Sequence, residues 1–174
     1  MPKNFFPQVV CFDGNGRFHE IQFGMASHIG VLHDFISIGI SKTFSYLTQY
    51  EFKTKPHFGQ DSDIDAFVKE KQMKRNDSFP VKSTVRGEET LAFIYVNSDR
   101  VDQSTPVFIS AGHKCSVHAA LEFMKYLRYL QDMLLDGKSA FKRESCVPLL
   151  IDHVDKMTRQ AILDLEKNEL LFKY

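Results

Sequence analysis

The stretch that decides the fold runs from Gln8 to Lys42 and reads QVVCF followed by DGNGRFHEIQFGMASHIGVLHDFISIGISK. Gln8–Phe12 is a short apolar run without alternation, which indicates a strand buried on both faces. A second short strand is predicted at Ser37–Ser41. The helix predicted between the two strands has apolar residues at helical spacing, namely Met25, Ile29, Leu32 and Ile36. Strand, helix and strand form a βαβ unit, whose two strands are parallel.

Bulk composition limits the classes of protein that fit. The 174 residues are 43% apolar, enough for one core, so we expect a single domain over residues 1–174. Lys plus Arg and Asp plus Glu both number 22, so no global basic signature of a nucleic-acid binder exists. A positive cleft on a neutral protein remains compatible with phosphate binding.

The cysteines and the N-terminal residues bear on location. Cys11, Cys115 and Cys146 have no CxxC spacing, which disfavours a disulfide framework or a zinc knuckle. The sequence shows neither a secretory signal nor an apolar run of membrane-spanning length, so we expect no membrane contact. An intracellular protein of the cytoplasm, the nucleus or both is therefore expected.

Further elements are predicted downstream. Tyr46–Gly59 is loop-like, and Ser62 is expected to cap a short helix that runs into the basic segment Lys69–Arg75. Strands are predicted at Thr90–Val96 and Pro106–Ser110. Ser116 then caps a long helix that stops near Asp136 and Gly137. A final amphipathic helix is expected from the spacing of Leu150, Val154, Met157, Ala161 and Leu165.

The local chemistry centres on Asp13–Gly16 and His19. A carboxylate at a strand end, with glycines that let a ligand approach the backbone, suits a divalent-metal phosphodiester site. The same four residues are also an ordinary turn sequence, and His19 alone is also typical of a surface histidine. Lys42 directly follows the second strand, on the same expected sheet edge as Asp13, where it either meets a phosphate or is solvated.

Two other groups carry open alternatives. Gly112–Lys114 ends the strand Pro106–Ser110 at what should be the same edge as Asp13, or simply forms a helix entry loop. Lys69–Arg75 either contacts a nucleic-acid backbone or is a solvated helix face.

The stretch from Asp13 to Lys42 resembles the signature block of the endonuclease V family. That family has Asp-Gly-x-Gly after a strand, then a His-Pro pair, Gly-x-Ala-Ser/Cys-His-x-Gly-Val-Leu and Ile-Gly-Val-Ala-Lys. Arg75–Pro80 and Pro106–Lys114 resemble further family segments in the same order, and the resemblance extends over roughly Pro7–Leu127.

The resemblance implies an RNase H-like α/β fold, a mixed sheet with flanking helices. It also implies Mg²⁺- or Mn²⁺-dependent hydrolysis of a phosphodiester bond 3′ to inosine, in RNA or DNA that is expected to be single-stranded. By the same resemblance Asp13 binds metal, and His19 and Lys42 contact the scissile phosphate. The backbone at Gly14, Gly24 and Met25 lines the hypoxanthine pocket. Reading an inosine requires extruding the base into such a pocket.

The resemblance also implies a second acid near the C-terminus. Pro148–Arg159 (PLLIDHVDKMTR) fits the family spacing, with Asp155 in the place of the acid that completes the metal site. Asp152 or Glu144 fills this role if the register differs. An insert around residues 131–147 separates this segment from the preceding helix.

Departures from the family pattern leave two functions open. The family's N-terminal antiparallel strands, with two further acids, do not fit into the twelve residues before Asp13. The family's His-Pro is His19-Glu20 here, and its Ala-Lys-Lys is Ser41-Lys42-Thr43. We therefore weigh a metal-dependent endonuclease against a catalytically inactive nucleic-acid-binding or interaction module.

The absent strands leave Gln8–Phe12 as an expected exposed sheet edge, which favours pairing with another chain. The explanations are an incomplete form of a full nuclease, a split protein with a partner chain supplying the strands, and a homologue that no longer cuts.

Overall fold

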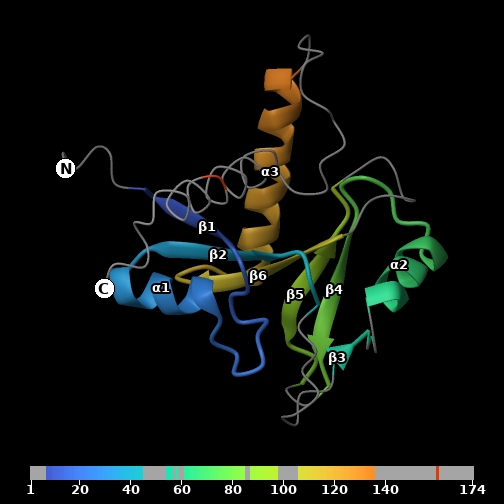
Figure 1. The fold of residues 1–174 in the computed structure, drawn as a ribbon, viewed down its shortest axis with the longest axis horizontal. Helices are drawn as coiled ribbons and strands as arrows, with labels where there is room; N and C mark the ends of the chain where they lie inside the picture. The colour runs from blue at the N-terminus through green and yellow to red at the C-terminus, as the bar shows by residue number, and fades with distance from the viewer. Residues whose placement is uncertain are drawn as a thin grey trace.

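The computed structural model describes residues 7–44, 54–56, 58, 61–84, 87–97, 106–135 and 160. They form a mixed sheet with helices on both faces (Figure 1). The strands are β1 (Val9–Asp13), β2 (Ile36–Ser41), β3 (Thr54–Lys55), β4 (Ser78–Ser83), β5 (Thr90–Tyr95) and β6 (Val107–His113). The helices are α1 (Met25–His33), α2 (Asp61–Glu70) and α3 (Val117–Leu135). None of the helices described is long and apolar enough to cross a bilayer.

The sheet has the strand order β1-β2-β6-β5-β4-β3. β1 and β2 are parallel, in the register Asp13 to Ile40, which confirms the predicted βαβ unit. β6 runs antiparallel to β2, and β5, β4 and β3 follow as antiparallel neighbours. Within the described part of the chain β1 pairs with β2 alone and is half-buried, as expected of an edge strand.

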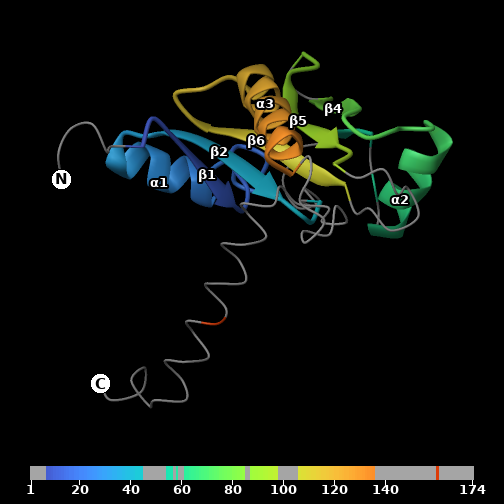
Figure 2. The same ribbon diagram turned by 90° about the horizontal axis from the view of Figure 1, so that it is seen from above.

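Two apolar clusters fill the two faces of the sheet. Alternate residues of one strand point to opposite faces, so Ile38 and Ile40 pack with α3, while Ser37 faces α1 and Gly39 faces the segment Gly14–Gly16. Figure 2 shows α1 and α3 on opposite sides of the sheet. The face shared by α1 and α2 is rich in phenylalanine, and its ring contacts join these residues: Phe18, Phe44, Phe58, Phe67, Phe79 and Phe108.

Long, strongly patterned elements match the sequence-based predictions. Ser116 caps α3 as predicted, since its Oγ accepts the N–H of Ala119 at 3.1 Å. The apolar face predicted for this helix includes Ala120, Leu121 and Met124, and all three are buried. The predicted final helix, and the insert beyond residue 135, lie outside the described residues apart from Gln160.

Several predictions for the middle of the chain were wrong. The second helix begins at Asp61, so Ser62 lies inside it, and the helix ends at Glu70 rather than continuing to Arg75. Thr54–Lys55 forms a short strand within the segment predicted as a loop. Ser78–Ser83 is a strand that the sequence analysis did not predict.

Candidate functional site

Asp13 and Lys42 meet at the carboxyl ends of the two parallel strands. Asp13 is the last residue of β1, and Lys42 directly follows β2. Because the strands pair in parallel, both ends fall at one edge of the sheet, where open α/β sheets place ligands. Lys42 Nζ lies 3.2 Å from Asp13 Oδ2, and both side chains are more than a third exposed. Because both side chains reach solvent, the Lys42 ammonium group can contact a bound phosphate and the Asp13 carboxylate can contact a bound cation.

The chain after Asp13 crosses tightly over the sheet. Gly14 N–H donates to Ile40 O at 2.8 Å, and Gly16 N–H donates to the buried Ser110 Oγ at 2.9 Å. Gly39 of β2 lies directly beneath this crossing: a Cβ there would come within 2.8 Å of Gly14 O. The glycine of β2 therefore lets the backbone beyond Asp13 pass at close range.

The three residues predicted to line a base pocket are brought together by this crossing. Gly24 N–H donates to Gly16 O at 2.9 Å, which returns the chain beside Gly14. Met25 then begins α1, and its side chain lies over Gly14 at ordinary contact distance, with a Cβ on Gly14 being 3.7 Å from Met25 Cβ. Gly24 itself is buried, so the accessible surface beside Asp13 is formed by the half-buried Gly14 and the exposed Met25.

His19 belongs to a turn that follows the segment Gly14–Gly16. Its N–H donates to Arg17 O at 2.9 Å, and its own carbonyl accepts the N–H of Gln22 at 2.7 Å. The neighbouring Phe18 is fully buried, with its ring 5.2 Å from that of Phe44, two residues beyond Lys42. Phe18 therefore holds the His19 turn near the segment that carries Lys42.

The described residues do not by themselves complete a metal site. Nowhere in the described ranges do three His, Cys, Asp or Glu side chains gather as metal ligands would. Asp13 contributes one carboxylate, and Mg²⁺ or Mn²⁺ prefers several oxygen ligands. Asp155, the second acid predicted to bind metal, lies outside the described residues, as do its substitutes Asp152 and Glu144.

The prediction that Gly112–Lys114 shares the edge of Asp13 was wrong. β6 is antiparallel to β2, so Ser41 pairs with Phe108 and Ser37 pairs with His113 at the opposite end. There Lys114 Nζ lies 2.6 Å from an Asp34 oxygen. The Lys114 hydrogen bond, followed by that of His113, lowers the pKa of Asp34. This cluster joins the end of α1 to the end of β6.

The two described cysteines are poor nucleophiles. Burial, with a smaller contribution from Cys115, raises the pKa of Cys11 to about 11. Burial also raises the pKa of Cys115, whose thiol donates to Ser37 O at 3.1 Å. Because the thiolate is the reactive form, neither cysteine is suited to covalent catalysis at neutral pH.

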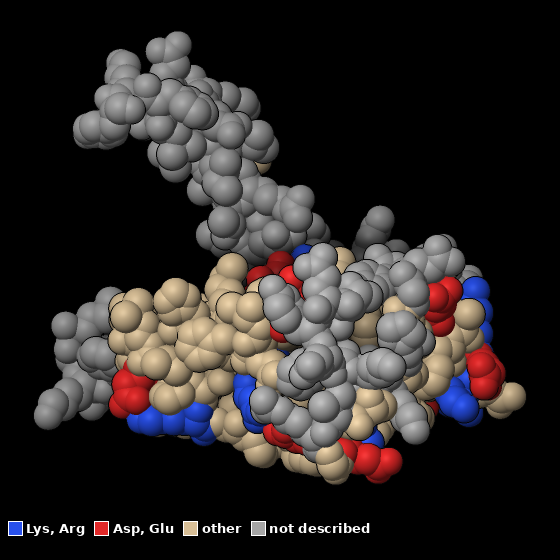
Figure 3. All heavy atoms as spheres, turned by 90° about the horizontal axis from the view of Figure 1, so that it is seen from below, with Lys and Arg blue, Asp and Glu red and all other residues tan. Residues whose placement is uncertain are grey.

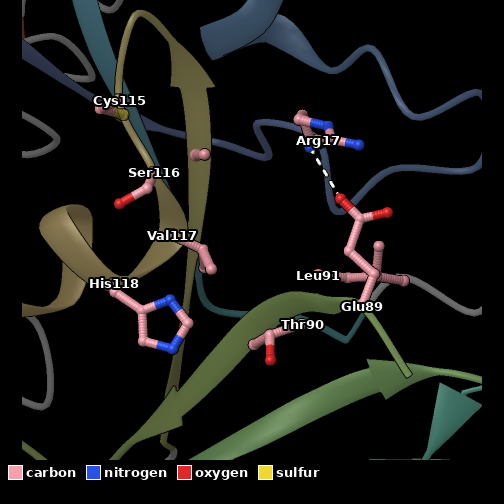
Figure 4. A pocket seen from close by; sticks show the side chains of 9 residues that line it. Arg17, Glu89, Thr90, Leu91, Cys115, Ser116, Val117 and His118 are labelled. Carbon is pink, nitrogen blue, oxygen red and sulfur yellow. Dashed lines mark ion pairs between the residues drawn. The ribbon is translucent and has the colours of Figure 1, made fainter. Parts of the chain in front are cut away.

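A pocket of about 240 Å³ opens near the C-terminal end of β6, away from Phe108 (Figure 4). The figure shows Arg17 and Glu89 joined across one side, at 3.0 Å, with Ser116 and His118 opposite. The ion pair ties the loop after β1 to the start of β5. Neither Asp13 nor Lys42 lines this pocket.

Exposed apolar side chains in the loop before α1 were missed by the sequence analysis. Ile21 is 67% exposed and Phe23 is 43% exposed, although residues of this kind are usually buried. The available signal was their position: they alternate with polar residues outside any predicted helix or strand.

Comparison with known proteins identifies the family. A family model described as Endonuclease V matches residues 2–131. Human Endonuclease V is 34% identical over 119 residues, which are 66% of this chain and 36% of the human protein. Endonuclease V of Thermofilum pendens is 33% identical over 115 residues, 66% of this chain and 38% of the relative. The chain belongs to the Endonuclease V family, and it spans about a third of the length of these relatives.

Solved structures show the same fold. The crystal structure of human ENDOV superimposes with a TM-score of 0.65 at 27% identity, covering 92% of this chain and 56% of the human chain. Ciona intestinalis Endonuclease V, solved in complex with a 24mer DNA containing an inosine followed by a ribo-adenosine, gives a TM-score of 0.67 at 28% identity. That match covers 94% of this chain and 58% of the other. The predicted RNase H-like mixed α/β sheet is confirmed.

Proposed function

We propose that this chain is the catalytic part of a metal-dependent endonuclease that hydrolyses a phosphodiester bond 3′ to inosine in RNA or DNA. The observation that carries the proposal is the Asp13–Lys42 pair, 3.2 Å apart, at the carboxyl ends of parallel strands. Membership of the Endonuclease V family and the inosine-containing DNA bound by the Ciona relative support it.

Each residue of the proposed site has a role that suits its chemistry. Asp13 holds a divalent ion, with Asp155 supplying a second carboxylate from outside the described residues. Lys42 and His19 contact the oxygens of the scissile phosphate, since both side chains can present a donor to an anion. A bound Mg²⁺ or Mn²⁺ activates water and neutralises charge on the phosphate.

The inosine base lies against the surface formed by Gly14, Gly24 and Met25. Gly14 is half-buried and leaves backbone atoms open to the edge of a base, and the Met25 side chain offers an apolar contact for its face. Gly24 is buried against Asn15 and Gly16 and fixes the position of Met25. An extruded base reaches this surface more easily from a single strand, because fewer stacked and paired neighbours must be separated.

A catalytically inactive binding module is the second candidate. It is favoured by the single carboxylate that the described residues bring to the site. In that case Asp13 and Lys42 form a structural ion pair, and nucleic acid binds without being cut.

The two candidates are separated by incubating a labelled single-stranded RNA containing one inosine with the purified chain and Mn²⁺. We expect one cut 3′ to the inosine, and a loss of at least about a hundredfold in rate for Asp13→Ala, because a metal-holding acid acts directly on the transition state. Asp65→Ala, which changes an exposed acid on α2, is the matched control and should cut normally.

Each alternative result has a definite meaning. Binding without cutting by the folded chain would contradict the nuclease proposal and favour the binding module. Equal cutting by Asp13→Ala would remove Asp13 from the site. A DNA strand of the same sequence, tested in parallel, compares the two substrates.

A further inference from the structure

An exposed apolar surface lies beside the proposed site, and two of its residues, Ile21 and Phe23, have no role in that site so far. Ile21 is 67% exposed, Phe23 43% and Met25 57%. All three belong to the loop between β1 and the first residue of α1. Several large apolar side chains exposed within five residues are unusual on a folded protein, and such groups can mark a surface that binds a ligand.

The surface is held in place by backbone hydrogen bonds. Gln22 N–H donates to His19 O at 2.7 Å, and Gly24 N–H donates to Gly16 O at 2.9 Å. Ala26 N–H donates to Asn15 O at 3.0 Å, which fixes the start of α1 against the segment after Asp13. A surface ordered before the ligand arrives loses less conformational entropy on binding.

Phe23 presents a supported ring. Its centroid lies 6.0 Å from that of the exposed His28 on α1, with an angle of 36° between the rings. The surface is continuous with the proposed base pocket, since Met25 lies over Gly14. A ligand that enters the pocket beside Gly14 therefore contacts Met25, and Phe23 lies two residues before Met25 in the same segment.

Charge decides which part of a nucleic acid fits here. Seen from below, the surface over α1 is mostly uncharged, with basic and acidic side chains together at its rim (Figure 3). An uncharged surface does not attract phosphate, but aromatic and apolar side chains accept the flat face of a base. Extruding one base removes a stacking partner from each neighbouring base, so a replacement surface for a neighbour stabilises the extruded state.

We propose that Phe23, supported by His28 and flanked by Ile21 and Met25, stacks on the nucleobase adjacent to the inosine. This inference rests on the proposed function, because it assumes that inosine occupies the pocket beside Gly14. Phe23 is then a positioning residue: it holds the substrate strand in place and does not touch the reacting atoms.

The test is a stacking measurement that needs no cleavage. 2-Aminopurine, whose fluorescence falls on stacking against a protein ring, is placed either 5′ or 3′ of the inosine in a single-stranded RNA. Binding is followed in EDTA for the unaltered chain, Phe23→Ala, Phe23→Tyr and Leu32→Ala. Leu32 is the matched control, an apolar residue that is 65% exposed near the other end of α1.

We expect the fluorescence to change at one of the two positions for the unaltered chain, Phe23→Tyr and Leu32→Ala. Phe23→Ala should lose this change and bind about tenfold more weakly, as expected when one base loses its aromatic partner. The inference is overturned if Phe23→Ala matches the unaltered chain in both signal and affinity, or if neither position responds in the unaltered chain.

Failure of this inference and failure of the proposed function give different results. A stacking signal without Mn²⁺-dependent cutting would keep the stacking surface and reject the nuclease. Cutting without a stacking signal would keep the nuclease proposal and reject the stacking surface. Circular dichroism of Phe23→Ala confirms that the variant is folded, and Ile21→Ser provides a second variant that should weaken binding less, because it leaves the ring in place.

Discussion

At the residue scale, the missing side chain of Gly39 allows the backbone that follows Asp13 to pass close to β2. A Cβ on Gly39 would lie 2.8 Å from Gly14 O, within a crossing made of backbone atoms. Gly39→Ala should therefore lower the free energy of unfolding by about 1–3 kcal/mol, measured by urea denaturation. Gly14→Ala is the control, because its Cβ would meet Met25 at an ordinary 3.7 Å. Equal destabilisation by both variants would show that the crossing is not tight.

Also at the residue scale, the buried phenol of Tyr95 has a raised pKa. Burial raises the pKa of its phenol to about 12, against smaller opposing effects of Arg128 and Arg75, and its hydroxyl donates to Asn76 Oδ1 at 2.9 Å. The folded state keeps this proton where the unfolded chain, with a pKa near 10, has lost it. The contribution of Tyr95 to stability is therefore complete below about pH 10 and is lost as the pH rises towards about 12.

An alkaline titration followed by tyrosinate absorbance checks this shift. Of the six tyrosines, one should ionise late or together with unfolding, and Tyr95→Phe should remove that late step. Tyr126→Phe, which changes an exposed tyrosine, should leave it in place. A Tyr95→Phe protein that retains the late step would contradict the assignment.

At the scale of elements, Asp132 links α3 to the segment after α2. Its carboxylate contacts both Arg75 and Arg128, and the Arg128 side chain is only 3% exposed. Asp132→Asn leaves two guanidinium groups close together without the shared negative charge. We expect a loss of about 1–3 kcal/mol in unfolding free energy, less than for a fully buried pair because Asp132 is 42% exposed.

Glu122 on the same helix offers the matched control for thermal or urea unfolding. Its pair with Lys125 is 2.9 Å long but its side chain is 69% exposed. Glu122→Gln should change the unfolding free energy by less than about 0.5 kcal/mol. If Asp132→Asn were equally silent, the guanidinium cluster would not contribute to holding α3.

Local pattern also explains which elements the sequence predicted. β1, β2 and α3 have strong apolar runs or helical periodicity, and each forms close to its predicted range. α1 also forms where predicted, but its predicted apolar face was wrong: Met25 and Leu32 are exposed, Ile36 begins β2, and the buried residues are Ala26, Ser27 and Gly30. β4 was missed because Pro80 and Lys82 interrupt its apolar pattern, and proline weakens the expectation of a strand. Its antiparallel pairing with β5, in which Ser78 lies opposite Tyr95, stabilises it instead. That stabilisation comes from residues distant in the sequence.

At the scale of the whole molecule, the direction of each strand decides which of the predicted site residues lie at the same edge of the sheet. Asp13 and Lys42 lie together because their parallel strands are joined by a single helix, which local sequence reveals. His113 and Lys114 lie at the opposite end because β6 is antiparallel, and no local pattern encodes that direction. The exposure of Phe23 likewise depends on how the loop packs after folding.

The overall charge balance leads to a last prediction, for binding of single-stranded RNA. With 22 basic and 22 acidic residues, attraction to phosphate must come from a few local contacts such as Lys42 rather than from the whole surface. Since each phosphate contact adds about 0.7 to the salt slope for single strands, we expect a shallow slope of about −1 to −2 in a plot of log affinity against log salt.

Lys42→Ala should reduce the magnitude of that slope by about 0.7, whereas Lys125→Ala, on α3 and paired with Glu122, should leave it unchanged. Fluorescence anisotropy across a range of salt concentrations measures both. A slope much steeper than about −4 would mean that many phosphates are contacted, so residues beyond the Asp13 edge would form most of the binding surface. A slope unchanged by Lys42→Ala would place the phosphate away from Lys42, and the Asp13–Lys42 pair would then be structural.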